Sequence, residues 1–152
     1  MPLAWHIRTA QAADASSLER CMHAAYTPYL ARLGNRRLPP LDADYAAEIR
    51  DFPCWVVDSP RGIIGGLIMN FGPEPASIAN VAIHPGFHGQ GIGGVLMRLA
   101  ESAAVEQKRD RLQLATHRKL HENLSLYRHL GWCEIGRQGD RVLFEKTITP
   151  PQ

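Results

Sequence analysis

The chain has 152 residues, of which 45% are hydrophobic and 21% are charged, and these proportions are typical of a single folded domain. Its 17 basic and 15 acidic side chains leave a formal net charge of +2, which is too small to favour nucleic acid as a partner. The three cysteines, Cys21, Cys54 and Cys133, are far apart, which argues against disulfides and a zinc site and predicts a reduced, cytoplasmic location. We expect a soluble protein without a signal peptide or a membrane partner, because the most apolar stretch, around residues 62–71, is too short to span a bilayer.

The N-terminal third is predicted to contain one strand and two helices. Trp5–Arg8 reads as a short strand, and Ser16–Glu19 has the spacing of a capping box, which predicts that a helix begins at Ser16. Apolar residues continue along one face of this helix to Tyr29. Glycine and proline residues predict a loop over residues 32–40, and a second short helix is expected from about Asp42 to Arg50, with an aspartate near its N-terminus.

Three consecutive strands are predicted next. Cys54–Asp58 and Ile63–Phe71 form a hairpin across a turn of Ser, Pro, Arg and Gly, and Ser77–His84 follows a second turn. The second strand contains Gly65 and Gly66, which indicate a β-bulge or a close backbone approach.

Helices and strands alternate in the rest of the chain. A glycine-rich loop opens a long helix, in which apolar residues from Ile92 to Ala103 recur at helical spacing. The elements expected after it are a buried strand, a short helix and a closing antiparallel pair: Leu112–Thr116, Glu122–Leu130, Trp132–Gly136 and Arg141–Thr147. The predicted fold is therefore α/β of the α+β type, with a mixed, largely antiparallel sheet of about seven strands and about four helices.

The most informative stretch runs from Val81 to Gly94, where a strand leads into a loop dense in glycine and then into a helix. Glycines let the backbone turn its N–H groups toward a ligand, and a helix N-terminus adds unpaired donors and a positive dipole. This combination predicts a site for a phosphate or pyrophosphate group. Gly89 to Gly94 also satisfy G-x-G-x-x-G, but five residues separate them from the strand and the next strand ends without an acid, which argues against a dinucleotide fold. No Gly-Lys-Ser/Thr follows, which excludes a P-loop.

The segment from His88 to Gly93 resembles the pyrophosphate loop of the GNAT superfamily of acyl-CoA-dependent N-acyltransferases, whose pattern is Arg/Gln-x-x-Gly-x-Gly/Ala. His88 stands where the family has Arg or Gln, and we expect this exchange to affect only a side-chain contribution, by weakening binding or making it pH-sensitive. The resemblance implies that the loop binds the pyrophosphate of CoA through backbone N–H groups and that the preceding strand binds the pantetheine arm. The residues that it implies in cofactor binding here are Val81, Ala82, Ile83, His88, Gly89, Gln90, Gly91, Ile92, Gly93 and Gly94.

A second match lies downstream, where Asn123, Tyr127, Gly131 and Trp132 fit the family segment Asn-x-x-x-Tyr-x-x-x-Gly-aromatic. Asn123 and Tyr127 are four residues apart and share one helix face. The resemblance implies that Asn123 contacts the pantetheine arm and that Tyr127 protonates the departing thiolate as a general acid. It also makes the Val81 N–H the candidate for polarising the thioester carbonyl, as in an oxyanion hole. Tyr127 and Val81 are thus the predicted catalytic residues.

The resemblance covers nearly the whole chain and implies one acyltransferase domain over residues 1–152 with a GNAT-like sheet. It implies an N-acetyltransferase that moves an acetyl group from acetyl-CoA, without a metal, to a primary amine of a small molecule, a peptide or a protein. The stretch from Tyr26 to Tyr45 is where such proteins vary and build the acceptor pocket, and the family's frequent dimers make a homodimer the expected oligomer. Two alternatives stay open: a non-catalytic acyl-CoA-binding sensor or partner module, and a nucleotide-binding domain of another class.

No motif identifies the group that deprotonates the amine. His84, His117, Glu122 and Glu74 lie on segments that flank the expected site. His117 and Glu122 rank first among them, and water is the alternative. The remaining histidines lack the spacing of metal ligands.

Overall fold

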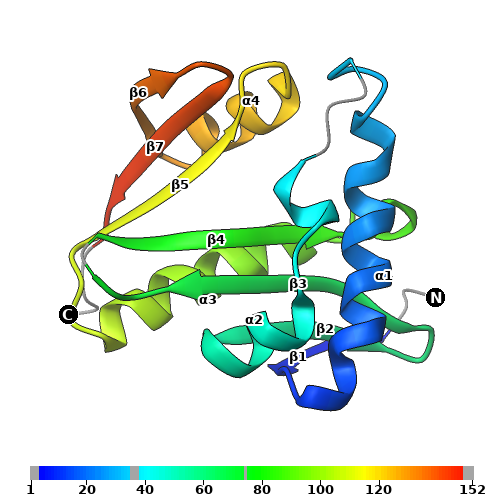
Figure 1. The fold of residues 1–152 in the computed structure, drawn as a ribbon. Helices are drawn as coiled ribbons and strands as arrows, with labels where there is room; N and C mark the ends of the chain where they lie inside the picture. Colours follow the sequence, from blue (N-terminus) through cyan, green and yellow to red (C-terminus); the bar gives the residue numbers. More distant parts are fainter. Residues whose placement is uncertain (1–3, 35–37, 74, 149–152) are drawn as a thin grey trace.

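The structure is a computed structural model that describes residues 4–34, 38–73 and 75–148. Within these residues, seven strands form one sheet in the order β1-β2-β3-β4-β5-β7-β6 (Figure 1). Their bounds are His6–Thr9 for β1, Cys54–Ser59 for β2, Gly62–Asn70 for β3, Ala76–Ile83 for β4, Arg111–His117 for β5, Cys133–Gln138 for β6 and Arg141–Thr147 for β7. Every neighbouring pair is antiparallel except β4 and β5, so the predicted mixed, largely antiparallel sheet is confirmed.

Four α-helices cover the two faces of this sheet, and their order along the chain is the predicted one. Their bounds are Ala15–Tyr26 for α1, Tyr45–Asp51 for α2, Ile92–Glu106 for α3 and His121–His129 for α4. Helices α1 and α2 pack on one face around Leu18 and Met22, and α3 and α4 pack on the other around Leu96 and Phe144 (Figure 1). The sheet is therefore the middle of three layers, with an apolar core on each side.

The N-terminus of α1 differs from the prediction, because Ser16 does not cap it. A 3-10 turn over Ala12–Asp14 precedes the helix, and the carboxylate of Asp14 accepts a hydrogen bond from the Gln11 N–H at 2.7 Å. The same carboxylate forms an ion pair with Arg8 of β1 at 2.8 Å. An acid that can bond both a backbone donor and a neighbouring strand outcompetes a serine that offers only a local cap. Helix α2, in contrast, has the expected aspartate: Asp44 accepts from a backbone N–H in its first turn.

Both interpretations of the paired glycines in β3 are confirmed. Val57 pairs with Gly65 while the next residue of β2 pairs with Ile63, so Ile64 is the extra residue of a bulge. A Cβ on Gly66 would lie only 2.7 Å from the Leu18 side chain and 3.0 Å from that of Met22. Glycine here lets α1 pack directly onto the sheet.

The sheet opens between β4 and β5. These parallel strands pair only at Ala76↔Leu112 and Ser77↔Gln113, and beyond these pairs they diverge (Figure 1). A second bulge lies at this point, because Ile68 of β3 pairs with Asn80 and Met69 pairs with Ile78, which leaves Ala79 extra. Since a bulge bends the strand that carries it, β4 turns away from β5. The last residues of β4 are left with a backbone edge that no neighbouring strand occupies.

Candidate active site

Two cavities lie where β4 and β5 diverge. The first, of about 390 Å³, is lined by the end of β4, the glycine-rich loop, α3 and α4, and we call it the glycine-loop cavity. The second, of about 580 Å³, is lined by the middle of β4, by β5, by the turn at residues 38–40 and by the β6–β7 turn, and we call it the β5 cavity. Tyr26, Val81, Asn123 and Tyr127 line both cavities. Ligands in the two cavities would meet at these four residues, which we call the junction.

The glycine-loop cavity gathers the residues that the sequence predicted for the cofactor. Every one of them lines this cavity except Gln90, which is exposed in the loop. Gly89 and Gly91 have φ values of 84° and 80°, in the left-handed region that side chains rarely adopt. Gly91 is also the N-cap of α3, so the loop delivers the unpaired N–H groups of the first helical turn to the cavity.

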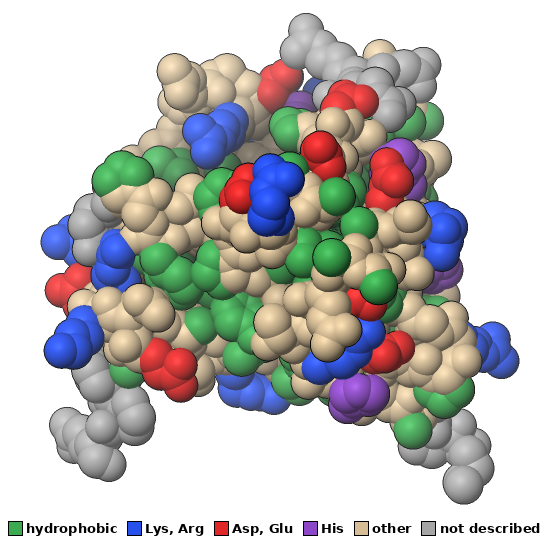
Figure 2. Space-filling view, turned by 60° about the horizontal axis from the view of Figure 1, so that its bottom comes forward, with side chains coloured by type: hydrophobic (Ala, Val, Ile, Leu, Met, Phe, Trp, Pro, Cys, Tyr) green, Lys and Arg blue, Asp and Glu red, His purple; other side chains and the backbone are tan. Residues whose placement is uncertain are grey.

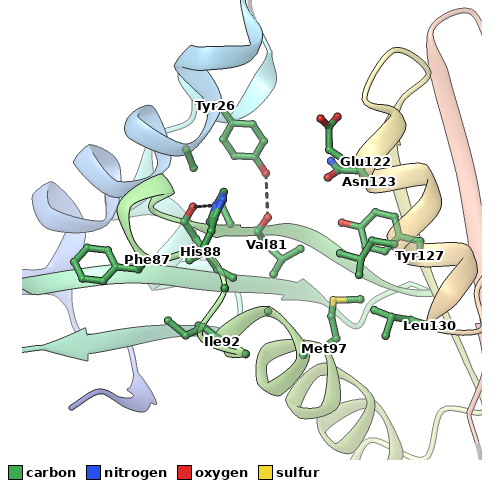
Figure 3. Close-up of a pocket in the computed structure, with 18 of the residues that line it drawn as sticks. Tyr26, Val81, Phe87, His88, Ile92, Met97, Glu122, Asn123, Tyr127 and Leu130 are labelled. Carbon is green, nitrogen blue, oxygen red and sulfur yellow. Dashed lines mark hydrogen bonds between the residues drawn. The ribbon is translucent and has the colours of Figure 1, made fainter. Parts of the chain in front are cut away.

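The edge of β4 faces the junction with its backbone. The His84 N–H bonds to the Ile64 carbonyl of β3, and alternate residues of an antiparallel strand point their N–H and C=O to opposite sides. Val81 and Ile83 therefore direct their backbone groups away from β3, into the gap. Two side-chain contacts agree: the Tyr26 hydroxyl lies 3.2 Å from the Val81 oxygen, and His88 Nε2 lies 3.2 Å from the Ile83 oxygen (Figure 3). The Val81 N–H is thus directed to where its predicted role requires it, and that role stays a prediction.

Helix α4 brings its two predicted residues to the opposite wall. Tyr127 is buried and its ring contacts those of Trp132 and Phe144, while its hydroxyl points toward Val81 (Figure 3). Burial raises the pKa of Tyr127 to about 12, so the hydroxyl keeps its proton at neutral pH. Asn123 lies one turn earlier on the same helix and donates from Nδ2 to the Thr116 hydroxyl at 3.3 Å.

Glu122, one of the two groups ranked first as the general base, forms an ion pair. The Glu122 carboxylate lies 2.7 Å from Nη1 of Arg32, and the hydrogen bond from that guanidinium holds the pKa of Glu122 below its usual range. A carboxylate with a lowered pKa is a weaker base. Glu122 lines the glycine-loop cavity but not the β5 cavity.

The candidate histidines are engaged in local contacts. His117 Nδ1 accepts from the Lys119 N–H at 3.1 Å, and its Nε2 lies 3.5 Å from the Asp140 carboxylate, so both ring nitrogens have partners. His84 Nδ1 accepts from the Gly86 N–H at 3.0 Å, which fits a role in shaping the turn. Glu74 lies outside the described residues.

The tyrosines of the predicted acceptor region, residues 26–45, do not all line the same cavity. Tyr26 lies at the junction, whereas Tyr29 lines only the glycine-loop cavity and packs under the Arg32 guanidinium at 5.7 Å. Tyr45 is buried and lines neither cavity. Asn80, which the sequence did not single out, lines the β5 cavity and bonds to both Tyr26 and Tyr45. Asn80 could have been singled out from the sequence, because it is the one amide side chain within the otherwise small or apolar segment 76–83.

The surface and the rest of the described chain add three findings. On the face shown in Figure 2, acidic and basic side chains are interspersed and no continuous basic stripe is visible. Among the described residues, no helix combines the length and the hydropathy that crossing a membrane requires. No cluster of three or more His, Cys, Asp or Glu side chains suited to a metal ion occurs in the same part of the chain.

Comparison with known families identifies the domain. The family model described as the acetyltransferase (GNAT) domain matches residues 50–134, which contain the glycine-rich loop, α4 and the edge of β4. The chain belongs to the GNAT acetyltransferase family. The resemblance in the sequence is therefore confirmed, and the glycine-rich loop, whose residues match the family's pyrophosphate pattern except at His88, is part of a GNAT domain. A comparison with curated protein sequences gives no significant match.

Solved structures share the architecture of this GNAT domain at low sequence identity. The PaiA N-acetyltransferase of Thermoplasma acidophilum, solved in complex with coenzyme A, is 18% identical with a TM-score of 0.83, over 95% of this chain and 99% of that one. A GNAT-family acetyltransferase of Staphylococcus aureus is 14% identical with a TM-score of 0.78, over 96% and 100% of the two chains. Ard1 of Thermoplasma volcanium is 17% identical with a TM-score of 0.74, over 97% and 100%. These likenesses support the fold.

Proposed function

We propose that this GNAT domain transfers an acetyl group from acetyl-CoA to a primary amine of a small molecule, a peptide or a protein, by direct attack on the thioester. The observation that carries the proposal is the meeting of two cavities at Tyr26, Val81, Asn123 and Tyr127, one of which is lined by the glycine-rich loop. The donor occupies the glycine-loop cavity and the amine enters through the β5 cavity. The coenzyme A bound by the Thermoplasma acidophilum enzyme of similar fold supports a CoA-linked donor.

The donor is held mainly by backbone groups. The N–H groups around Gly89 and Gly91 and at the start of α3 bind the pyrophosphate, because they are unpaired donors at the positive end of a 15-residue helix. The pantetheine arm runs along the open edge of β4, where Val81 and Ile83 direct their backbone groups into the gap. His88 Nε2 lies 3.2 Å from the Ile83 carbonyl oxygen, so a pantetheine amide that bonds to this oxygen either displaces the imidazole or uses the second lone pair.

In the chemical step, the amine nitrogen attacks the thioester carbon and forms the C–N bond, and the C–S bond then breaks. The Val81 N–H stabilises the negative charge that develops on the carbonyl oxygen, a contribution worth roughly 10²–10³ in rate for one such donor. Water takes the first proton, which converts the ammonium ion to the free amine before the attack, since Glu122 and His117 are engaged elsewhere. After the C–N bond forms, the Tyr127 hydroxyl protonates the departing sulfur, and the second proton lost by the nitrogen restores the hydroxyl.

The test is calorimetric titration with acetyl-CoA, CoA and NAD. We expect both CoA species to bind and NAD to give no signal, and a screen of primary amines for thiol release should then find an acceptor. Binding of NAD but of neither CoA species would refute the proposal.

The second candidate function is a non-catalytic acyl-CoA-binding module, which the engagement of Glu122 and His117 favours. It predicts tight binding of acetyl-CoA with no thiol release for any amine. Release of thiol by one amine above the rate without protein would exclude it.

A further inference from the structure

A chain of hydrogen bonds leads from the junction to the wall of the β5 cavity. Tyr26, at the end of α1, has its hydroxyl 2.8 Å from Asn80 Oδ1. Asn80 Nδ2 lies 3.3 Å from the Tyr45 hydroxyl, and that hydroxyl lies 2.6 Å from the Pro40 carbonyl oxygen. These contacts join three segments that are far apart in the sequence.

The donor and the acceptor of each hydrogen bond in this series can be assigned from its last bond, the one between Tyr45 and Pro40. A carbonyl oxygen can only accept, so Tyr45 donates its single hydroxyl proton to Pro40. Tyr45 must then accept from the Asn80 amide, which turns the Asn80 oxygen toward Tyr26. Tyr26 therefore donates its own proton, either to Asn80 or to the Val81 carbonyl at 3.2 Å, both of which only accept. The Tyr26 oxygen keeps its lone pairs for a third partner.

The position of Tyr26 indicates what that partner is. It is one of the four junction residues, and the proposed function assigns the thioester oxygen to Val81 and the sulfur to Tyr127. The fourth junction residue, Asn123, already donates a hydrogen bond to the Thr116 hydroxyl. Tyr26 extends from α1 and Tyr127 from α4, and the hydroxyl groups of both point toward Val81 (Figure 3). Burial raises the pKa of Tyr26 well above its ordinary value, so the group acts as a neutral hydroxyl and not as a base.

We propose that the Tyr26 oxygen accepts a hydrogen bond from the acceptor amine and thereby directs the nitrogen lone pair at the thioester carbon, while Asn80 and Tyr45 are positioning residues that fix Tyr26. This inference rests on the proposed function and names the amine-binding group of the same site. The bond strengthens as the nitrogen becomes positive during attack, so it favours the transition state over the bound amine. It also restricts the acceptor to amines that keep at least one N–H besides the lone pair.

The test uses two CoA derivatives and needs no knowledge of the natural acceptor. In one, the sulfur carries an N-ethylcarbamoylmethyl group, which places an amide N–H near the junction; in the other, an ethoxycarbonylmethyl group replaces that N–H by an ester oxygen. We expect the wild-type protein to bind the amide about 2- to 10-fold more tightly than the ester, as one neutral hydrogen bond gives. In Tyr26→Phe this preference should disappear, while unmodified CoA binds as before.

Two further variants separate the proposed contact from a structural role. Tyr45→Phe removes, outside the cavities, the hydroxyl that orients the Asn80 amide, so it should lower the melting temperature and reduce the preference for the amide without removing it, whereas a merely structural role would leave the preference unchanged. Asn80→Ala frees the Tyr26 proton to turn elsewhere and should reduce the preference without removing it. If Tyr26→Phe does not fold, the inference is still tested by the ratio of the Kd values for the ester and the amide derivatives, measured in the wild-type protein and in Asn80→Ala.

Three results would overturn the inference. If the wild-type protein binds both derivatives equally, or if Tyr26→Phe keeps the full preference, Tyr26 does not contact the amine and the proposed function survives. If the protein binds none of the CoA species, the proposed function fails and the inference falls with it.

Discussion

Replacement of Gly91 by alanine tests whether the glycine-rich loop binds the cofactor through its backbone. Gly91 has φ of 80° and is the N-cap of α3. A Cβ there would meet no described atom within 4 Å, so the substitution creates no clash. What it adds is backbone strain, because an L-residue in the left-handed region costs roughly 1–2 kcal/mol.

The loop can relieve this strain only by rotating φ, and the rotation turns neighbouring N–H groups away from the pyrophosphate. Loss of one hydrogen bond to a charged group costs about 1.5–3 kcal/mol, which corresponds to a rise of about 10- to 100-fold in the Kd of CoA. The free energy of unfolding should fall by no more than the strain energy, and each kcal/mol lowers Tm by roughly 2–4 °C in a chain of this size.

Gly62 provides a matched control at the β2–β3 turn. It has φ of 93° and equally open surroundings, but it does not line either cavity. Calorimetric titration with CoA and thermal melting are performed on both variants. We expect similar losses of Tm and a weakened Kd only in Gly91→Ala. Equal CoA affinities in the two variants would show that the backbone of this loop does not bind the cofactor.

Three other predictions concern the proposed general acid Tyr127, the ion pair between Arg8 and Asp14, and the cysteine thiols. Tyr127→Phe should slow turnover by about 10²-fold or more, the usual contribution of a general acid, with little change in acetyl-CoA affinity, and an unchanged rate would remove Tyr127 from the mechanism. The Arg8 guanidinium lowers the pKa of Asp14, so the stability lost in Asp14→Asn should be full above pH of about 4 and should vanish as the pH falls through the lowered folded-state pKa, as urea unfolding at each pH will show. Cys133 is exposed whereas burial raises the pKa of Cys21 to about 11, so an aromatic disulfide reagent at pH 8 should label Cys133 alone in the folded protein; rapid labelling of a second thiol would contradict the burial.

Much of the fold could be predicted because its signals are local. The helical spacing of apolar residues in α3 and the turn before Gly62 act within a few residues, and both lie in the structure where the pattern indicated. The glycine-rich loop could be read as an anion site for the same reason, since φ values and helix ends are set by neighbouring residues.

The opening of the sheet could not be predicted in this way. It depends on the bulge at Ala79, which no local sequence pattern marks, and on how few residues pair β4 with β5, two strands that are distant in sequence. The ranking of Glu122 as a base had the same weakness. Its partner Arg32 lies 90 residues away, and only the folded chain shows that the carboxylate is already neutralised.

The two sides of the junction also differ in where their residues lie along the chain. The glycine-rich loop, Val81 and Tyr127, which we assign to the donor, all fall within residues 50–134, the part that matches the GNAT family. Tyr26 and Tyr45, which we assign to the amine and its support, lie before it. Asn80 is one place where the two parts bond to each other, since it lies on β4 next to Val81 and contacts both tyrosines. The proposed donor site thus lies in the part of the chain that matches the family, whereas the proposed geometry of amine attack depends on contacts from α1 and α2.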